Sequence, residues 1–328
     1  MTDSLCELGC NEVEALRPLL AEYPYLFDGQ YLGEVPHRFL EDAFLRRSKE
    51  ELSQGKQYSV TWKEGTEILG LANVQHLGWD SQHFGVPMVR LELMAGAKLE
   101  ISFALELIRA AIRICSDRGI VHVSCRIHLG APKALEALAS CGFCPVGVKL
   151  TLRAMPGDIK SMDPIPDVRL RDFEPRDAAR VRELAGSAVT DSRFHRDGRF
   201  APRLVGALYE DWVERTIGRE SSHIMVAQRG NEVVGFLASD IGIPVYGLKQ
   251  EDLGGVQTGF VGLVVVDICA RGSGIAKQLI SEGTDRLFRR GCDVVYANVM
   301  LSNEPSVNAF FRTGFGLKGS VQELHLWL

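Results

Sequence analysis

Residues 266–276 read VDICARGSGIA and place glycines and a cation where an apolar strand meets an amphipathic helix. A glycine costs up to ~1 kcal/mol in a helix compared with alanine, so Gly272 and Gly274 need a reason at this helix start. Backbone N–H groups at a helix N-terminus, supported by the helix dipole, bind phosphate groups. The glycines let phosphates approach the backbone, and Arg271 adds a charged donor. This stretch therefore predicts a pyrophosphate-binding loop.

Two other glycine-rich phosphate motifs fit this stretch poorly. A P-loop requires G-x-x-x-x-G-K-[ST], and no Lys-Ser or Lys-Thr pair follows here. A dinucleotide fingerprint requires a third glycine, yet Lys277 and Gln278 stand near its place. The pattern that fits is [RQ]-x-x-G-x-[GA] after a long apolar strand, on Arg271, Gly272, Ser273, Gly274, Ile275 and Ala276.

Composition limits the class of protein. The 328 residues are 46% hydrophobic and 24% charged, as in a soluble globular protein with two domains. The net charge of -5 argues against a general nucleic-acid binder. No apolar run approaches the ~20 residues that span a bilayer, and MTDSLCELGC is too acidic for a secretion signal.

The cysteines indicate a reducing compartment. The chain has eight, scattered rather than spaced as a disulfide framework, which favours the cytoplasm. Cys141 and Cys144 have C-x-x-C spacing, but only Cys6 and Cys10 could complete a metal site in space. We therefore expect thiols and no metal.

An internal repeat organises the chain. The segments RGIVHVSCRIHLGAPKALEALASCGF and RGCDVVYANVMLSNEPSVNAFFRTGF end in Gly-Phe and lie 172 positions apart without a gap. This period is too long for a solenoid, so we infer a duplicated domain. The stretch RAMPGDIKSMDPIPDV, rich in proline, is typical of a linker. We expect a first domain over 1–155, a linker over 156–167 and a second domain over 168–328.

The second domain is predicted to begin with a short strand and two helices. Two strands joined by the turn at 229–232 follow, and then the long apolar strand 258–266 and the helix 274–290. A strand over 293–300, a short helix near 305–313 and a last strand near 321–328 complete the domain. The first half shows the same order more faintly.

These motifs resemble the GNAT superfamily of acyl-CoA-dependent N-acyltransferases. The family pattern of Val, four residues and Arg-Gly-x-Gly-[IL]-[GA] falls on residues 266–276. A second pattern, with Asn, Tyr and Gly-Phe, falls on Asn303, Phe310 and Gly314-Phe315. The resemblance implies an α/β (α+β) fold of tandem GNAT-like domains, each a mixed, mostly antiparallel sheet flanked by helices. It implies acetyl-CoA or another acyl-CoA as co-substrate, bound by Val264, Val266, Arg271, Gly272, Ser273, Gly274, Ile275, Ala276, Asn303 and Phe310.

The first half lacks the coenzyme motif. An offset of 172 places Leu99 at the position of Arg271 and Glu100 at that of Gly272. A carboxylate is electrostatically unfavourable beside phosphates, so we expect a degenerate N-terminal copy and one coenzyme per chain.

The resemblance implies direct attack of a neutral amine on the thioester, with a backbone N–H near Val264–Val266 stabilising the oxyanion, worth ~3 kcal/mol. Phe310 replaces the usual acid, a tyrosine, but a thiol of pKa ~8.5 is a fair leaving group as thiolate. Asp240 and Asp191 are candidate bases, and each also fits an ordinary strand-end or cap carboxylate. Two hypotheses follow: an active N-acyltransferase, or a non-catalytic acyl-CoA-binding or assembly protein.

The segment DSRFHRDGRFAPR, residues 191–203, is cationic and aromatic in an acidic chain. Arginine forks suit a diphosphate and aromatic rings suit a base or sugar, although a solvated loop would look alike. We expect an acceptor site formed by Arg193, Phe194, His195, Arg196 and Arg199.

Segments 79–91, 134–143 and 191–218 are similar to bacterial TDP-fucosamine acetyltransferases, which implies a nucleotide sugar with a 4-amino group as acceptor. The long glycine-rich segment 241–255 departs from that family, so another small amine or a protein N-terminus stays open. We expect a cytoplasmic protein with no nucleic-acid partner and no membrane span; a homodimer is left open.

Overall fold

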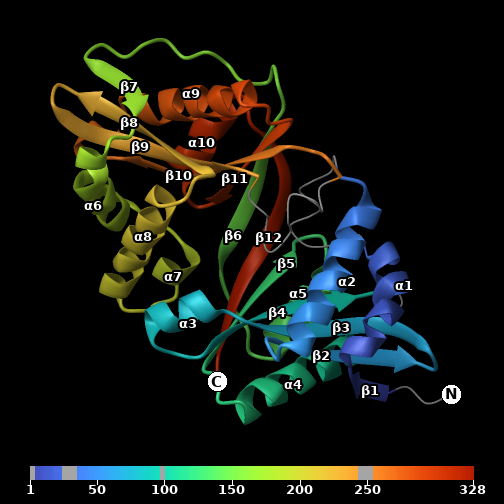
Figure 1. Ribbon diagram of the computed structural model, residues 1–328. Helices are drawn as coiled ribbons and strands as arrows, with labels where there is room; N and C mark the ends of the chain where they lie inside the picture. Colours follow the sequence, from blue (N-terminus) through green and yellow to red (C-terminus); the bar gives the residue numbers. More distant parts are fainter. Residues whose placement is uncertain (1–3, 24–34, 97–99, 243–253) are drawn as a thin grey trace. The chain divides into compact units, whose positions relative to one another are not determined.

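The computed structural model describes residues 4–23, 35–96, 100–242 and 254–328 (Figure 1). The chain forms two compact units. The first comprises Met1–Gly147 together with Ser320–Leu328, and the second comprises Val148–Gly319. Each unit has a mixed β-sheet with helices on both faces, as the predicted tandem fold requires.

The sheet of the first unit has the strand order β1-β2-β3-β4-β5-β12, and only β4 and β5 run parallel. Apolar residues alternate or run continuously along these strands, and helices α4 and α5 bury one face while η1, α1 and α2 bury the other. The strands are β1 (Ser4–Glu7), β2 (Gln57–Glu64), β3 (Glu67–His76), β4 (Met88–Ala95), β5 (His122–His128) and β12 (Gly316–Trp327). The helices are η1 (Cys10–Leu16), α1 (Arg17–Glu22), α2 (His37–Ser53), α3 (Gly78–Phe84), α4 (Ile101–Asp117) and α5 (Pro132–Ser140).

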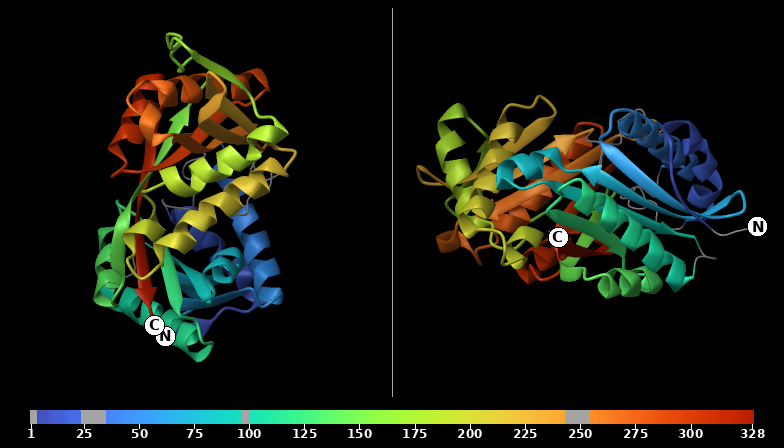
Figure 2. Two further views of the ribbon diagram at one scale, coloured as in Figure 1. Left: turned by 90° about the vertical axis from the view of Figure 1, so that its left-hand side faces the viewer. Right: turned by 90° about the horizontal axis from the view of Figure 1, so that it is seen from below.

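The sheet of the second unit has the order β6-β11-β10-β9-β8-β7, and only β10 and β11 run parallel. Helices α9 and α10 pack on one face, and α6 and α8 lie side by side on the other (Figure 2). The strands are β6 (Cys144–Ala154), β7 (Val168–Asp172), β8 (Ser222–Arg229), β9 (Glu232–Ile241), β10 (Thr258–Val266) and β11 (Val294–Met300). The helices are η3 (Pro175–Asp177), α6 (Ala178–Ala188), α7 (Arg193–Arg196), α8 (Pro202–Ile217), η6 (Ile268–Ala270), α9 (Ile275–Arg289) and α10 (Glu304–Thr313).

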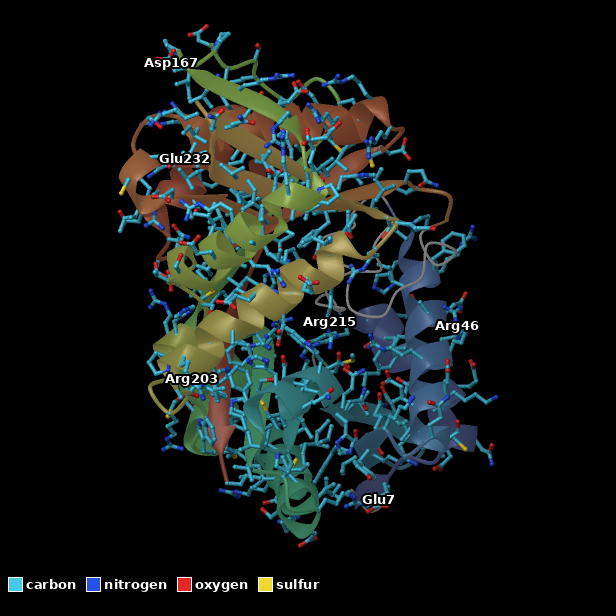
Figure 3. All side chains as sticks on the ribbon, turned by 60° about the vertical axis from the view of Figure 1, so that its left-hand side comes forward. Glu7, Arg46, Asp167, Arg203, Arg215 and Glu232 are labelled. Atoms are coloured by element: carbon cyan, nitrogen blue, oxygen red, sulfur yellow. The ribbon has the colours of Figure 1, made fainter. Side chains whose placement is uncertain are left out.

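The two repeats share the order of their main strands and helices. Adding 172 to the bounds of β5 gives the bounds of β11, and adding it to the last residue of α4 gives the last residue of α9. The predicted turn between β8 and β9 is also present, with Glu232 at the start of β9 (Figure 3). The duplication inferred from the sequence therefore corresponds to two copies of one topology.

The last strand of each repeat belongs to the unit of the other repeat. Lys149–Ala154 of β6 pair with β11, and Val321–Trp327 of β12 pair with β5. Leu152 is fully buried in the core of the second unit, and Leu324 is buried in the core of the first. The bounds of the compact units therefore differ from those of the predicted domains 1–155 and 168–328. The reason is that β6 and β12 pair and pack outside their own repeat.

The proline-rich segment 156–167 lies within the second unit instead of forming a free linker. The backbone N–H of Lys160 donates to the carbonyl of Thr313 in α10 at 3.0 Å. The hydroxyl of Ser281 in α9 donates to the carbonyl of Lys160 at 2.8 Å. Prolines prevent regular structure here, but these bonds hold the segment against both helices.

No helix among the described residues is long and apolar enough to cross a membrane.

The strand exchange predicts where a C-terminal mutation acts. Leu324→Ala should destabilise the first unit by about 2–5 kcal/mol, because it leaves a cavity in that core. Hydrogen exchange followed by mass spectrometry should then show faster exchange in β5 than in β10. Leu317→Ala is the matched control in β12, because Leu317 is 59% exposed and lies in the second unit. If Leu324→Ala increased hydrogen exchange in β10 alone, the assignment of β12 to the first unit would be contradicted.

Candidate active site

Strands β10 and β11 part within the second unit. Their parallel pairing covers Thr258–Val261, and a bulge follows at Gly262, where the register of β10 against β9 shifts. Leu263–Val266 then pair with β9 and have no pairing with β11. The splay beside this strand, which the sequence led us to expect near Val264–Val266, is therefore present. Backbone groups on this side of β10 are placed to meet an extended ligand.

The glycine loop lies directly after this opening. Gly272 and Gly274 have φ angles of 79° and 91°, in the left-handed region that side chains with a Cβ rarely adopt. Gly274 is the N-cap of α9, and Ile275 and Ala276 form its first turn. Among the described residues, no group accepts a hydrogen bond from the backbone N–H groups of Gly272, Ser273 and Gly274. These groups and the helix dipole make the loop suitable for an anion.

Arg271 holds this loop to its surroundings. Its Nη2 donates to the carbonyl oxygen of Ala188 at 2.8 Å, and its Nε donates to that of Val266 at 3.3 Å. The side chain thus joins the end of α6 to the end of β10. The sequence led us to expect a donor to phosphate; the structure gives Arg271 a positioning role that the sequence did not indicate. The Ser273 hydroxyl likewise donates to the carbonyl of Ala270 at 2.6 Å.

The second motif lies on α10. The Asn303 side chain caps the helix by accepting from the N–H of Ser306 at 3.3 Å. Phe310 is 4% exposed and packs edge-on against Phe315, with ring centroids 5.0 Å apart. A buried phenyl ring therefore stands where the family pattern has its tyrosine, and it offers no proton.

The predicted acceptor segment folds into the short helix α7 and the start of α8, which Arg203 marks in Figure 3. Ser192 caps α7, and its hydroxyl lies 2.8 Å from Nδ1 of His195. The His195 ring stacks on Tyr209 of α8 with centroids 5.9 Å apart. These contacts fix the imidazole on the α8 side of the sheet.

The other predicted acceptor residues differ in their surroundings. Phe194 is 5% exposed and packs against Phe200 at 5.1 Å, so its ring is part of the interior and not an open stacking platform. Arg193 lies over the Phe194 ring at 4.4 Å. Arg196 is bound to Asp191 at 2.7 Å, whereas Arg199 is exposed.

The two candidate bases lie in different environments. Burial would raise the pKa of Asp191, but hydrogen bonds from Arg196 and from Ser302, at 2.7 Å, leave it below the usual range. Burial raises the pKa of Asp240, and its partners Ser222 and Arg219 oppose this only in part. Asp240 is 1% exposed, so an amine has little access to it.

Trp212 of α8 was not identified from the sequence as a residue of the site. A Cβ on Gly262 would lie 2.9 Å from the ring of Trp212 in α8, so the indole covers the bulge where β10 and β11 part. Tyr209 lies one helical turn earlier on α8. A glycine inside an apolar strand is a signal for such a close approach.

The first unit has the same strand arrangement, with Glu100 at the helix start that corresponds to the glycine loop. Strands β4 and β5 also pair in parallel over Met88–Leu91 and then part. Glu100, the N-cap of α4, has φ of -75° and ψ of 156° and no glycine beside it. Leu99 lies outside the described residues.

The buried carboxyl of Asp240 predicts a pH-dependent effect of substitution. Its raised pKa means that the folded protein holds the proton more tightly, so wild-type stability falls as pH rises above the ordinary value of ~3.8. Asp240→Asn keeps an acceptor for Ser222 without the charge. Its melting temperature relative to wild type should therefore be higher at pH 7 than at pH 4.

Asp240→Ala is the control, because it leaves the Ser222 hydroxyl without this acceptor and should cost about 1–3 kcal/mol. A melting temperature of Asp240→Asn that falls relative to wild type between pH 4 and pH 7 would refute the pKa shift.

Comparison with known proteins supports the GNAT fold. Residues 188–315 match the acetyltransferase (GNAT) family. No curated protein matches the chain significantly. A GCN5-related N-acetyltransferase from Sphaerobacter thermophilus has a similar structure, with a TM-score of 0.66 and 16% identity over 99% of this chain and 95% of that one. A tandem GNAT protein from the clavulanic acid biosynthesis pathway gives a TM-score of 0.57 and 12% identity over 99% and 98%.

A fungal multi-domain protein described as having a GCN5-related glucosamine N-acetyltransferase region gives a TM-score of 0.64 and 14% identity, with 99% of this chain and 38% of that chain covered. At these identities the likeness concerns the fold. The chain thus has a tandem GNAT fold, and its second unit contains the stretch that matches the acetyltransferase (GNAT) family.

Proposed function

We propose that the chain is an N-acetyltransferase that binds one acetyl-CoA at its second unit and transfers the acetyl group to a primary amine. The observation that carries this proposal is the glycine loop at the start of α9 next to the opening between β10 and β11. A pyrophosphate on the loop N–H groups would direct the pantetheine arm along Val264–Val266. The N-terminal copy offers Glu100 at the corresponding helix start, which would repel the phosphates.

The reaction needs few side chains. The amine nitrogen attacks the carbonyl carbon of the thioester, the C–S bond breaks, and the CoA thiolate leaves as the amide forms. A backbone N–H of β10 beyond Gly262 would stabilise the oxyanion. Phe310 offers no proton, so the thiolate leaves unassisted and takes its proton from solvent; a thiol pKa of ~8.5 makes this feasible.

We propose that His195 is the general base that takes the proton from the attacking amine. Asp191 is occupied by Arg196 and Ser302, and Asp240 is buried, so both are weak candidates for the base. Burial lowers the pKa of His195, with the charge of Asp191 opposing this shift, which favours a neutral imidazole near pH 7. His195 also stacks on Tyr209, one turn of α8 before the indole that covers Gly262.

The acceptor we propose is an anionic amino sugar such as a nucleotide sugar. Arg199 and Arg203 are exposed around the start of α8 and would meet its phosphates. The similarity of segment 191–218 to TDP-fucosamine acetyltransferases supports this class of acceptor. The interior position of Phe194 removes it from the proposed contacts.

The function is tested by thiol release from acetyl-CoA in the presence of aminated nucleotide sugars, neutral amino sugars and simple amines. We expect release to depend on the acceptor and to be fastest with the nucleotide sugars. Gly274→Ala should weaken CoA binding about tenfold or more, because the methyl group opposes a φ of 91° at the N-cap.

Gly291→Ala is the matched control, since Gly291 has a φ of 90° beyond the other end of α9 and open space around it. Both variants carry similar backbone strain, and only Gly274→Ala should change CoA affinity. The second candidate function is a non-catalytic acyl-CoA-binding protein, which is suggested by the phenylalanine at position 310 in place of an acid. CoA binding without thiol release for any acceptor would favour it.

His195→Gln tests the base. With saturating acceptor, wild-type kcat should rise with pH up to the pKa of His195, below its ordinary ~6.5, and then level off. In the variant, kcat should no longer rise over this pH range, and at pH 7 it should be about 10²-fold lower than in the wild type. His128→Gln, in the first unit, is the control, because burial lowers the pKa of His128 too. An unchanged pH profile in His195→Gln would exclude His195.

A further inference from the structure

A cavity in this unit lies beside the C-terminal half of α9, away from the glycine loop. It has a volume of about 310 Å³ and lies between the C-terminal half of α9 and strands β8 and β9, beside the end of β7. Its size is within the range of small-molecule sites. Its wall on α9 begins at Gly283 and continues to Arg286, nine and twelve positions after Gly274, which is about 14 and 18 Å along the helix at 1.5 Å per residue. It is therefore distinct from the proposed acetyl-CoA site.

The floor of this cavity is apolar. Met225 of β8, Leu237 of β9 and Leu287 of α9 line it, and all three side chains are buried. Gly283 lies on the α9 wall, where a Cβ would approach Leu237 within 2.9 Å, so the helix comes close to the sheet at that point. A short apolar chain could rest on this floor.

The charges at the mouth are unbalanced. Arg286 is neutralised by Asp172 and by Glu282, at 2.8 Å from the latter. Arg290 is exposed and, among the described residues, its guanidinium makes no hydrogen bond or ion pair. His223 and Ser239 add polar groups to the wall, and the charge of Arg290 contributes to the lowered pKa of His223, after burial. One positive charge is thus left for a ligand.

We propose that this cavity binds a small amphiphilic monoanion, with its carboxylate on Arg290 and its short apolar chain on Met225, Leu237 and Leu287. A guanidinium at the rim of an apolar pocket forms a charge-assisted pair with a carboxylate, while the chain leaves water. A cationic amphiphile would be repelled by the unbalanced charge of Arg290. This inference is independent of the acetyl transfer proposed above.

Octanoate is the probe, titrated calorimetrically into the full chain, with octanol and octylammonium as neutral and cationic analogues. We expect saturable binding of one octanoate, with octanol about tenfold weaker or more and octylammonium not bound. The affinity should be unchanged when CoA saturates the glycine loop. No binding of octanoate, equal binding of octanol, or displacement by CoA would each overturn the proposal.

Arg290→Gln should weaken octanoate binding about tenfold or more. Arg289→Gln is the matched control, because Arg289 is the neighbouring residue, 65% exposed and paired with Glu282 at 3.0 Å, and is not part of the cavity wall. It removes the same charge and should leave the affinity within about twofold. Equal losses in both variants would indicate a general charge effect and refute the site.

A measurement on the wild-type chain avoids dependence on variants. Phenylglyoxal modifies exposed arginines, and peptide mapping resolves Arg289 from Arg290. Octanoate should protect Arg290 and leave Arg289 reactive. Protection of neither residue, or of both equally, would contradict the placement of the carboxylate.

Discussion

The parting of β10 from β11 is the constraint on which the candidate site depends. Four paired residues hold the strands together, and the bulge at Gly262 then directs β10 away while it keeps its bonds to β9. The same strand ends where the glycine loop begins, so an opening between strands and a helix N-terminus occur at one place. The proposed acetyl-CoA site depends on both features, and the indole of Trp212 covers the side toward α8.

The exchange of final strands makes each sheet depend on a strand from the other repeat. β6 is the last strand of the first repeat but pairs with β11, and it brings Leu150 and Leu152 into the second core. Without β6, the outer edge of β11 would present unpaired backbone groups, and these apolar residues would be missing. This dependence concerns strand pairing and does not involve the segment before α4 or the loop before α9.

Several polar residues near the site form hydrogen bonds or ion pairs within the protein. Arg271 ties the end of α6 to β10, Arg196 holds Asp191, and Asn303 caps α10. Their partners are carbonyls, N–H groups or carboxylates that would otherwise be left unsatisfied near chain turns. This arrangement keeps the loop and the acceptor segment in place in the absence of ligand. A preorganised site of this kind loses less entropy when it binds.

The sequence by itself determined the repeat, the order of the main elements in each copy and the glycine loop at the start of α9, because these follow from periodicity and from glycines that few other residues can replace. The positive φ angles of Gly272 and Gly274 show the reason directly. It also indicated that Phe310 replaces an acid, since the residue type alone excludes proton donation.

Only the tertiary structure decided which unit each final strand joins, since β6 and β12 have patterns that suit either sheet and their partners are set by long-range pairing. It also decided the fate of the side chains around the site. Phe194 is interior because Phe200 packs against it, and Asp191 accepts a hydrogen bond from Ser302, more than a hundred positions away. Contacts between residues distant in sequence have no local signature, so burial and pairing of this kind could not be predicted from spacing.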